Sequence, residues 1–467
     1  MVFSDLFFLY IFLAACIPIY FISKKTLYRN IVLVAFSLIF YAWSSPVWLL
    51  LLLVSVTGNY FCGLMIDRWK GTGKAKIGVA CSLILSLGML FVFKYTDFFI
   101  ENINMVLGTA IPLQKIELPI GISFYTFQII SYIMDAYWGK VPVQKNFFKL
   151  LMYISLFPQL VAGPIVRYST VASEIDSRKT TIIDASEGIT RFITGLGKKV
   201  ILANGLNLIV EQFLDGDLTK VSVLGTWYGV IAYSLYVYFD FSGYSDMAIG
   251  LGRIFGFHFD ENFNYPFICK NITEFWQRWH ISLGSFFRDY LLYVPIFGKR
   301  RPYGGLFLVW FCTGFWHGAS WNYIIWGLYY GLFILAERLI GSKRLKKVPE
   351  AIMHVYNKLV IIIGFGIFHF TDISKLGVFF GNLVGANGNT FTDISVHTSF
   401  MNNIFLILFA VLICMPVIPK VKIMLQKSEA GENAVGAVTV ASNIIILLVC
   451  TILLVENTNN PFLYWQF

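Results

Sequence analysis

Long apolar stretches alternate with short polar ones along the whole chain. Because a helix needs about 20 apolar residues to cross the ~30 Å hydrocarbon layer of a membrane, this pattern predicts about eleven or twelve crossings. A helical hairpin is expected at 305–340. Single spans are expected at 5–22, 31–43, 47–66, 77–99, 120–137, 147–165, 221–239, 351–370, 400–418 and 437–455.

The composition agrees with a membrane protein rather than with soluble domains. Of the 467 residues, 57% are hydrophobic, 18% aromatic and only 13% charged, whereas charged residues make up about 25% of a typical soluble chain. The predicted fold class is therefore an all-α polytopic membrane protein. We expect one integral membrane domain over 1–467, with a core at 118–340, N-terminal helices at 5–99 and C-terminal helices at 351–455.

The formal net charge of +10 is explained by membrane topology. The Lys and Arg residues gather in short loops between apolar stretches, as expected of cytoplasmic loops, and not on one face that could bind nucleic acid. The basic loops at 24–29 and 68–76 lie two crossings apart, which places the N-terminus outside. The clusters at 299–301 and 343–347 are also expected in the cytoplasm, so the hairpin at 305–340 crosses an even number of times.

Three segments do not fit the pattern of simple spans. The stretch 166–187 is polar and is expected to form a loop. The stretch 189–213 carries three basic residues among apolar ones, which suits a helix at the membrane interface. Its crossing status stays open, as does that of 266–297.

The cysteines and histidines do not predict a metal site. The seven cysteines lie singly, with no CxxC pair, so they indicate neither a disulfide framework nor a zinc site. His280 and His317 lack the HxxxH or HExxH spacing of histidine metal ligands. The other four histidines have no comparable polar surroundings and are expected to be structural: His258, His354, His369 and His397.

Two histidines stand out because each lies beside tryptophan in a mostly apolar region. His280 ends the stretch Glu274-Phe-Trp-Gln-Arg-Trp-His280, and His317 follows Trp316 inside the predicted hairpin. At 1.5 Å per helical residue, His317 lies roughly 20 Å from the cytoplasmic end of the hairpin. An ionisable side chain at that depth is by default a functional candidate. The alternative is a structural histidine that only satisfies a backbone carbonyl.

Acyl transfer would use the two imidazoles in different ways. A neutral imidazole accepts a proton near pH 7, so His317 is the candidate base that deprotonates an attacking hydroxyl. His280 is the candidate for the second role, that of a donor which stabilises the oxyanion. We expect Trp316 and Trp321 to exclude water, and Asn322 to orient the imidazole of His317.

A polar helix is predicted to begin after Asn271. Asn271 can cap it, and Glu274 can reach back to the cap as in a capping box. A continuous helix places Glu274, Arg278 and Ser282 on one face, which suits the wall of a wet tunnel. The alternative is an interfacial helix whose Trp and Arg side chains lie at the headgroups.

A second polar cluster, Asp240-Phe-Ser-Gly-Tyr-Ser-Asp246, ends the span predicted at 221–239. Glycines follow it, so we interpret it as a seam of closely packed helices in which the acids pair with Arg278 or Arg288. Catalysis at this cluster is the less favoured alternative.

Six motifs occur in an order that resembles the membrane-bound O-acyltransferase (MBOAT) family, in particular its bacterial branch that acetylates alginate. They cover about three quarters of the chain. In sequence they are LPIGISFY at 118–125, FPQLVAGP at 157–164, DFSGYSD at 240–246, EFWQRWH at 274–280, FWHGASW at 315–321 and NPFLYWQF at 460–467.

The resemblance implies a fold, a site and a reaction. His317 matches the essential histidine of the family, and His280 matches its second polar active-site residue. A ring of helices is implied around a tunnel, with Asp246, Glu274, Arg278, Trp316 and Asn322 as the residues expected to shape it.

The resemblance also implies substrates and partners. No cofactor is expected to be bound; acetyl-coenzyme A is the expected acyl donor, arriving from the cytoplasm at a bacterial inner membrane. The acyl group is expected to pass through an extracytoplasmic esterase-like acetyltransferase to a polysaccharide hydroxyl. The machinery that makes or exports the polysaccharide is a further expected partner.

Two other functions stay open. Related proteins of teichoic acid modification share the histidine pair and take D-alanine from a carrier protein, so D-alanyl transfer is the nearest alternative. A transporter with a buried His, Asp and Arg proton relay is the alternative from another class. It predicts inverted halves with broken helices, and no such repeat is visible in the sequence.

Overall fold

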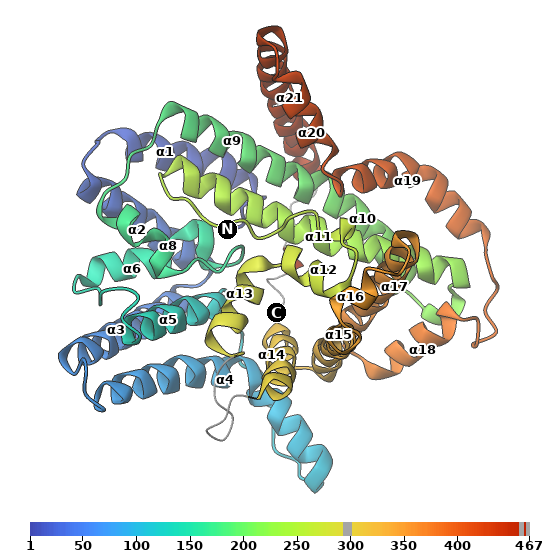
Figure 1. Ribbon diagram of the computed structural model, residues 1–467, viewed down its shortest axis with the longest axis horizontal. Coiled ribbons are helices and arrows are strands. Elements are labelled where there is room, and N and C mark those ends of the chain that lie inside the picture. Colours follow the sequence, from blue (N-terminus) through green and yellow to red (C-terminus); the bar gives the residue numbers. More distant parts are fainter. Residues whose placement is uncertain (293–300, 457–461, 464–467) are drawn as a thin grey trace. The chain divides into compact units, whose positions relative to one another are not determined.

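The computed structural model describes residues 1–292, 301–456 and 462–463. Helices account for all the regular structure within these ranges (Figure 1), which confirms the predicted all-helical class. Three parts of the predictions lie outside the described residues. They are Lys299 and Arg300 of the basic cluster, residues 293–297 of the ambiguous segment, and the terminal motif at 460–467 except Phe462 and Leu463.

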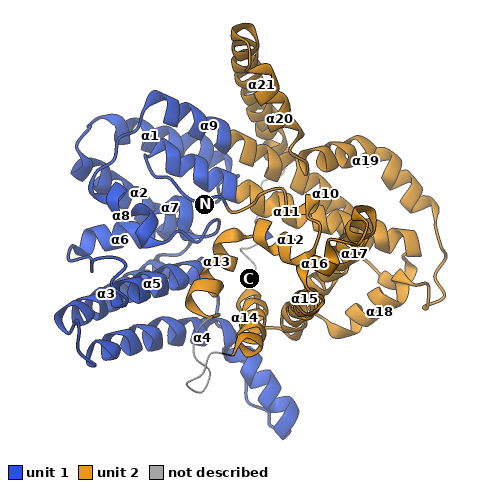
Figure 2. Cartoon of the chain, viewed as in Figure 1, with its two compact units in different colours: residues 1–192, 245–261, 458–467 blue, residues 193–244, 262–457 orange. Residues whose placement is uncertain are grey.

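The chain forms two compact units (Figure 2). Unit 1 comprises Met1–Phe192, Ser245–Glu261 and Thr458–Phe467, and unit 2 comprises Ile193–Tyr244 and Asn262–Asn457. Helices α9 (Ile182–Gly197) and α11 (Val223–Ile254) contribute residues to both units. The expectation of one integral domain stays a prediction.

Unit 1 contains the N-terminal helices. Besides its parts of α9 and α11, its elements are η1 (Phe8–Phe12), α1 (Leu13–Phe21), α2 (Thr26–Ser44), α3 (Pro46–Arg68), α4 (Ala75–Leu107), α5 (Ile122–Tyr137), α6 (Phe147–Ser155), α7 (Phe157–Leu160) and α8 (Tyr168–Asp176).

Unit 2 contains both histidines of interest. Besides its parts of α9 and α11, its elements are η2 (Lys198–Ala203), α10 (Asn204–Val210), η3 (Glu211–Asp215), η4 (Leu218–Lys220), η5 (Pro266–Ile268), α12 (Ile272–Arg278), α13 (Ile281–Tyr290), α14 (Pro302–His317), α15 (Trp321–Ile340), α16 (Ser342–Leu345), α17 (Glu350–His369), α18 (Ile373–Leu383), α19 (Ile394–Ile413), α20 (Val417–Leu425) and α21 (Glu429–Glu456).

Eight helical segments in the described part of the chain are long and apolar enough to cross a membrane. They confirm that the chain is a multi-pass membrane protein. One of them, Ile182–Asp215, contains the stretch 189–213 that the sequence left open. The others are Thr26–Ser44, Pro46–Arg68, Ala75–Leu107, Trp321–Ile340, Glu350–His369, Ile394–Ile413 and Glu429–Glu456.

Two local predictions in unit 1 are wrong. The helix expected at 147–165 ends at Ser155, because the backbone of Leu156 turns to ψ 112° and Pro158 then starts the short α7. The stretch 166–187, expected to be a loop, contains α8. Buried apolar side chains on one face, among them Val171 and Ile175, explain why this polar segment becomes helical.

Two of the recognised motifs pack against each other in unit 1. Gly121 has φ +78°, a left-handed conformation that favours glycine, and it begins α5. A Cβ at this position would collide with the backbone at Leu160 and Val161. The glycine therefore permits the close packing that buries α5 on nearly every side.

The glycines near the acidic cluster also pack as predicted. In unit 1, Gly188 lies against the backbone of Gly250, and in unit 2, Gly195 lies against Gly243. A Cβ at Gly188, Gly243 or Gly250 would collide with the opposing backbone, so these small residues allow close helix packing.

Candidate active site

His317 is the last residue of α14, at the turn of the predicted hairpin. The helix ends there because the next residue, Gly318, has an extended backbone, and α15 begins at Trp321. The two helices pack closely since Gly314 faces Gly327 with no room for a Cβ on either side. The hairpin that the sequence predicts is therefore confirmed, with His317 at its apex.

Aromatic rings surround the imidazole of His317, which is only 4% exposed. The ring centroids of Trp316 and Trp326 each lie 4.9 Å from the imidazole centroid, and that of Phe368 lies 5.3 Å away. All three contacts are edge-to-face. Trp316 itself is buried, whereas Trp321 is 50% exposed, and the exclusion of water by the two tryptophans stays a prediction.

His280 lies at a break between two short helices. Helix α12 ends at Arg278, Trp279 is extended, and His280 has φ +45° before α13 begins. The prediction of one continuous helix is wrong, and Ser282 does not continue the face that carries Glu274 and Arg278. The cause is a distant segment. The Asn264 N–H donates to the Arg278 carbonyl, and the Ile281 N–H donates to the Asn262 carbonyl, both at 2.9 Å.

Asn262 is a polar neighbour of His280 that the sequence did not identify. Its Oδ1 lies 3.2 Å from His280 Nδ1 and accepts hydrogen bonds from the Ser282 hydroxyl at 2.8 Å and the Ser282 N–H at 3.2 Å. Asn262 is fully buried. No local pattern in the sequence distinguishes this asparagine from one in a loop, because its partners lie 18 and 20 residues away.

One indole joins the two histidines. The ring of Trp316 lies 4.9 Å from His317 and 6.0 Å from His280, measured between centroids. On its other side His280 contacts Phe241 of α11 edge-to-face at 4.6 Å. The structure therefore brings together the two imidazoles that the sequence singled out, and both are nearly fully buried.

Asn322 supports this site through the backbone of α17. Its amide donates hydrogen bonds to the carbonyls of Phe368 at 3.0 Å and Ile367 at 3.3 Å. Since the Phe368 ring packs on His317, the asparagine holds one wall of the imidazole pocket. Its predicted role, direct orientation of the imidazole, stays a prediction.

Helix α12 is capped as predicted, with one difference. The Asn271 side chain accepts a hydrogen bond from the Glu274 N–H at 2.7 Å. Glu274 reaches back to the N–H of Lys270, one residue before the cap, at 2.9 Å. It also pairs with Arg278 at 2.9 Å, as the i, i+4 spacing indicated.

A second carboxylate also holds the start of α12. Glu337, near the end of α15, accepts hydrogen bonds from the Ile272 N–H at 2.7 Å, the Thr273 N–H at 2.9 Å and the Thr273 hydroxyl at 2.6 Å. Tyr356 donates to it at 3.3 Å. Glu337 lies near the C-terminus of its helix, where the helix dipole disfavours a negative charge. This unfavourable position is the signal in the sequence that could have indicated a distant partner.

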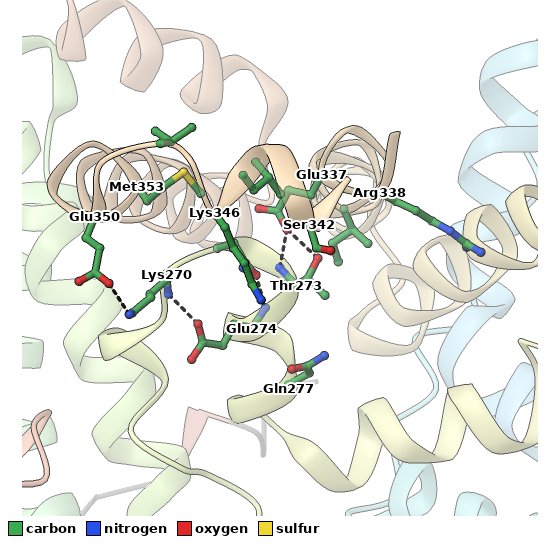
Figure 3. A pocket seen from close by; sticks show the side chains of 14 residues that line it. Lys270, Thr273, Glu274, Gln277, Glu337, Arg338, Ser342, Lys346, Glu350 and Met353 are labelled. Atoms are coloured by element: carbon green, nitrogen blue, oxygen red, sulfur yellow. Dashed lines mark hydrogen bonds and ion pairs between the residues drawn. The ribbon is translucent and has the colours of Figure 1, made fainter. Parts of the chain in front are cut away.

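A cavity of about 930 Å³ opens between α12 on one side and the end of α15 with the elements that follow it on the other (Figure 3). Ion-forming side chains are concentrated in its wall. The basic ones are Lys270, Arg338 and Lys346, and the acidic ones are Glu274, Glu337 and Glu350. Gln277, three residues before His280 in the chain, also lines it.

Two of these charges neutralise each other. Lys270 and Glu350 form an ion pair at 2.6 Å at one end of the cavity (Figure 3). The hydrogen bond that Lys270 donates to Glu350, together with the negative charge of this glutamate, raises the pKa of Lys270. Arg338 extends at the other end of the cavity and Lys346 projects from the wall opposite α12 (Figure 3).

The acids of the DFSGYSD cluster pair with other cations than those predicted. In unit 2, Lys199 donates to Asp240 at 2.7 Å, and both side chains are almost fully buried. In unit 1, Arg191 pairs with Asp246 at 2.6 Å and also with Glu261. Both cations come from the helical run that the sequence placed at the interface, and the predicted pairing with Arg278 or Arg288 stays a prediction. Arg278 pairs with Glu274, and Arg288 with Asp289.

Three of the other histidines have polar partners away from the imidazole pair. His258 contacts Glu174 at 2.6 Å, His369 contacts Asp215 at 3.0 Å, and His397 lies 3.0 Å from the Thr392 hydroxyl. Among the described residues, no group of three or more His, Cys, Asp or Glu side chains could hold a metal ion.

Known proteins are similar to this chain over most of its length. A sequence profile described as MBOAT, membrane-bound O-acyltransferase family, matches residues 36–377. "Probable alginate O-acetylase AlgI" of Pseudomonas aeruginosa is 40% identical over 377 residues, which cover 79% of this chain and 72% of that protein.

More distant relatives carry other names. "Peptidoglycan O-acetyltransferase" of Helicobacter pylori is 32% identical over 437 residues, covering 84% of this chain and 82% of that protein. "Teichoic acid D-alanyltransferase" of Bacillus subtilis is 33% identical over 246 residues, covering 50% of this chain and 62% of that protein.

Proposed function

Because this chain belongs to the membrane-bound O-acyltransferase family, we propose that it moves an acetyl group from a cytoplasmic thioester to a polysaccharide hydroxyl. The chain is an O-acyltransferase, which replaces the transporter alternative. Relatives named for O-acetylation align with 79% and 84% of the chain, whereas the D-alanyltransferase of Bacillus subtilis aligns with 50%. The coverage favours acetyl transfer over D-alanyl transfer.

The observation that carries this proposal is the pair of imidazoles on one indole. His280 and His317 come from different helices, yet both contact Trp316 and both are buried among aromatic rings. An imidazole that water cannot reach is well suited to exchange protons with a bound substrate, and such a positioned group contributes roughly 10²- to 10⁴-fold to rate.

The proposed reaction is one acyl transfer. The hydroxyl oxygen of the acceptor attacks the thioester carbonyl carbon while His317 takes the hydroxyl proton. The tetrahedral intermediate then collapses, the C–S bond breaks, and the leaving thiolate takes the proton from His317, which returns the imidazole to its neutral form. His280 assists in this cycle, and Trp316 keeps both rings dry so that water does not compete for the thioester.

The donor is proposed to be acetyl-coenzyme A, bound through its polar end in the cavity at the start of α12. A volume of about 930 Å³ lies at the upper end of small-molecule sites, and Arg338 and Lys346 suit phosphate groups. The 343–347 cluster is predicted to be cytoplasmic, which agrees with this location. An acidic carrier protein that presents a thioester is the second candidate donor, and it would bind the basic side chains at this cavity.

The membrane and partners follow from the same proposal. We place the enzyme in a bacterial inner membrane with the N-terminus outside, as the basic loops predict. The tunnel of the family would carry the acyl group across the bilayer, with Glu274, Arg278 and Asn322 of unit 2 near its path. An extracytoplasmic esterase-like acetyltransferase and the polysaccharide machinery are the proposed partners.

A transfer assay with two donors tests the proposal. Purified protein in lipid vesicles is given acetyl-coenzyme A labelled in the acetyl group, or a carrier protein that bears a labelled D-alanyl thioester, together with candidate polysaccharides and an esterase-like partner. We expect label to leave coenzyme A for the polysaccharide or the partner. Label that leaves only the D-alanyl carrier would establish the alternative function.

A further inference from the structure

We propose that Asn262 is a positioning residue that keeps the proton of neutral His280 on Nδ1, so that Nε2 accepts a hydrogen bond from bound substrate. The inference rests on the proposed function of His280. It changes the role expected from the sequence, because a neutral ring with this tautomer cannot donate from Nε2 to an oxyanion. Substrate donors of the right kind are the hydroxyl of the acceptor and the amide N–H groups of a pantetheine arm.

The orientation of the Asn262 amide is fixed by a backbone group. The Ser282 N–H lies 3.2 Å from Oδ1, and since an N–H only donates, the atom that faces it is the amide oxygen. The Ser282 hydroxyl donates to the same oxygen at 2.8 Å. His280 Nδ1 lies 3.2 Å from this oxygen, so Nδ1 is the nitrogen that carries the proton.

The backbone locks this arrangement in place. The Ile281 N–H donates to the Asn262 carbonyl, so the main chain of Asn262 is bonded to the residue that follows His280, while its side chain contacts His280 itself. The ring of His280 is faced by Phe241 from α11, by Trp316 from α14 and by Asn262 and Ser282, and these four carry no charge. The hydrogen bond to Asn262 therefore favours the tautomer that carries the proton on Nδ1.

The pH dependence of kcat tests this role with Asn262→Asp. The carboxylate keeps the shape of the side chain and stabilises the charged imidazolium, so the neutral ring exists only at higher pH. In the profile of kcat against pH, we expect the limb on the acidic side to move up by about one to two pH units. Asn264→Asp is the matched control, because this side chain is exposed two residues away and the limb should stay where it is.

Asn262→Leu tests the tautomer without adding charge. The leucine removes the acceptor for Nδ1, both tautomers become populated, and kcat should fall roughly 10- to 100-fold with the limb unmoved. If Asn262→Asp is not recovered as folded, monodisperse protein, kcat of Asn262→Leu alone tests whether Asn262 fixes the tautomer of His280. An unmoved limb in the aspartate variant, or more than half of kcat retained in the leucine variant, overturns the inference.

His280→Ala separates this inference from the proposed function. If His280→Ala retains full activity, the proposed role of the histidine itself is wrong. If that variant is inactive while the Asn262 variants behave as wild type, the histidine participates and only the control of its tautomer by Asn262 is refuted.

Discussion

The carboxylate of Glu337 accepts hydrogen bonds from both the backbone N–H and the hydroxyl of Thr273, although the two residues are 64 positions apart. Helix α15 thus starts just after His317, and near its end it is hydrogen-bonded to α12, the helix that ends two residues before His280. Glu337 therefore connects the helix that begins after His317 to the helix that ends before His280.

Glu337→Gln should weaken the hydrogen bonds between α15 and the start of α12. The amide presents an N–H₂ to one of the donors at the start of α12, and each hydrogen bond to a buried charged group contributes about 1.5–3 kcal/mol. We expect a lower thermal unfolding temperature and at least a tenfold loss of transfer rate in the remaining folded protein. Glu432→Gln, an exposed change in α21, is the control. Unchanged values for both quantities would show that α12 is held by other contacts.

Trp316→Leu should reduce kcat more than it affects donor binding. The change removes the indole that contacts both imidazoles and admits water between them. We expect kcat to fall roughly 10- to 100-fold while KM for the thioester stays within about twofold of wild type. The control is Trp321→Leu, since this tryptophan is 50% exposed. Equal losses in the two variants would argue against a special role for Trp316.

Charge reversal in the cavity should weaken donor binding. Lys346→Glu and Arg338→Glu each replace an attraction for phosphate by a repulsion. We expect KM for acetyl-coenzyme A to rise roughly 2- to 30-fold, since exposed ion pairs contribute about 0.2–1 kcal/mol and reversal doubles the change. The effect should shrink at high salt. Lys427→Glu, exposed before α21, should leave KM unchanged; a rise in all three variants would indicate a nonspecific effect of net charge.

The buried pair of Lys199 and Asp240 should behave differently from an exposed pair. Removal of one partner leaves an unpaired buried charge and costs about 3–5 kcal/mol, so Lys199→Met or Asp240→Leu alone should yield little folded protein. The double variant should recover most of the yield, because two apolar side chains replace both charges. The exposed pair of Lys220 and Asp217 is the control, and single changes there should have no measurable effect.

A failed rescue would have a clear meaning. If the Lys199→Met and Asp240→Leu double variant folds no better than either single one, the pair is required for more than mutual neutralisation. Phe241, next to Asp240, contacts His280, so transfer activity of the double variant also reports whether the pair fixes the position of that ring.

The features that the sequence predicts well are local. Four of them depend on residues within one helix or one turn. They are the lengths of the apolar stretches, the hairpin around His317, the cap at Asn271 and the ion pair of Glu274 and Arg278. Both histidines could be selected because ionisable groups are costly in an apolar setting. These signals require no knowledge of the rest of the fold.

The features that the sequence misses depend on distant partners. The break at His280 requires the backbone of Asn262 and Asn264, and the tie at the start of α12 requires Glu337. Periodicity alone therefore predicts a continuous helix where a distant segment interrupts it. The cations that meet Asp240 and Asp246 were missed for the same reason, since Lys199 and Arg191 are local to neither.

The most direct test of the central claim is the rate of label transfer from acetyl-coenzyme A by folded His317→Ala, with the exposed His397→Ala as control. We expect the control to match wild type and His317→Ala to lose roughly 10²- to 10⁴-fold, the contribution of a positioned base. Transfer by the His317 variant at the wild-type rate would contradict the account.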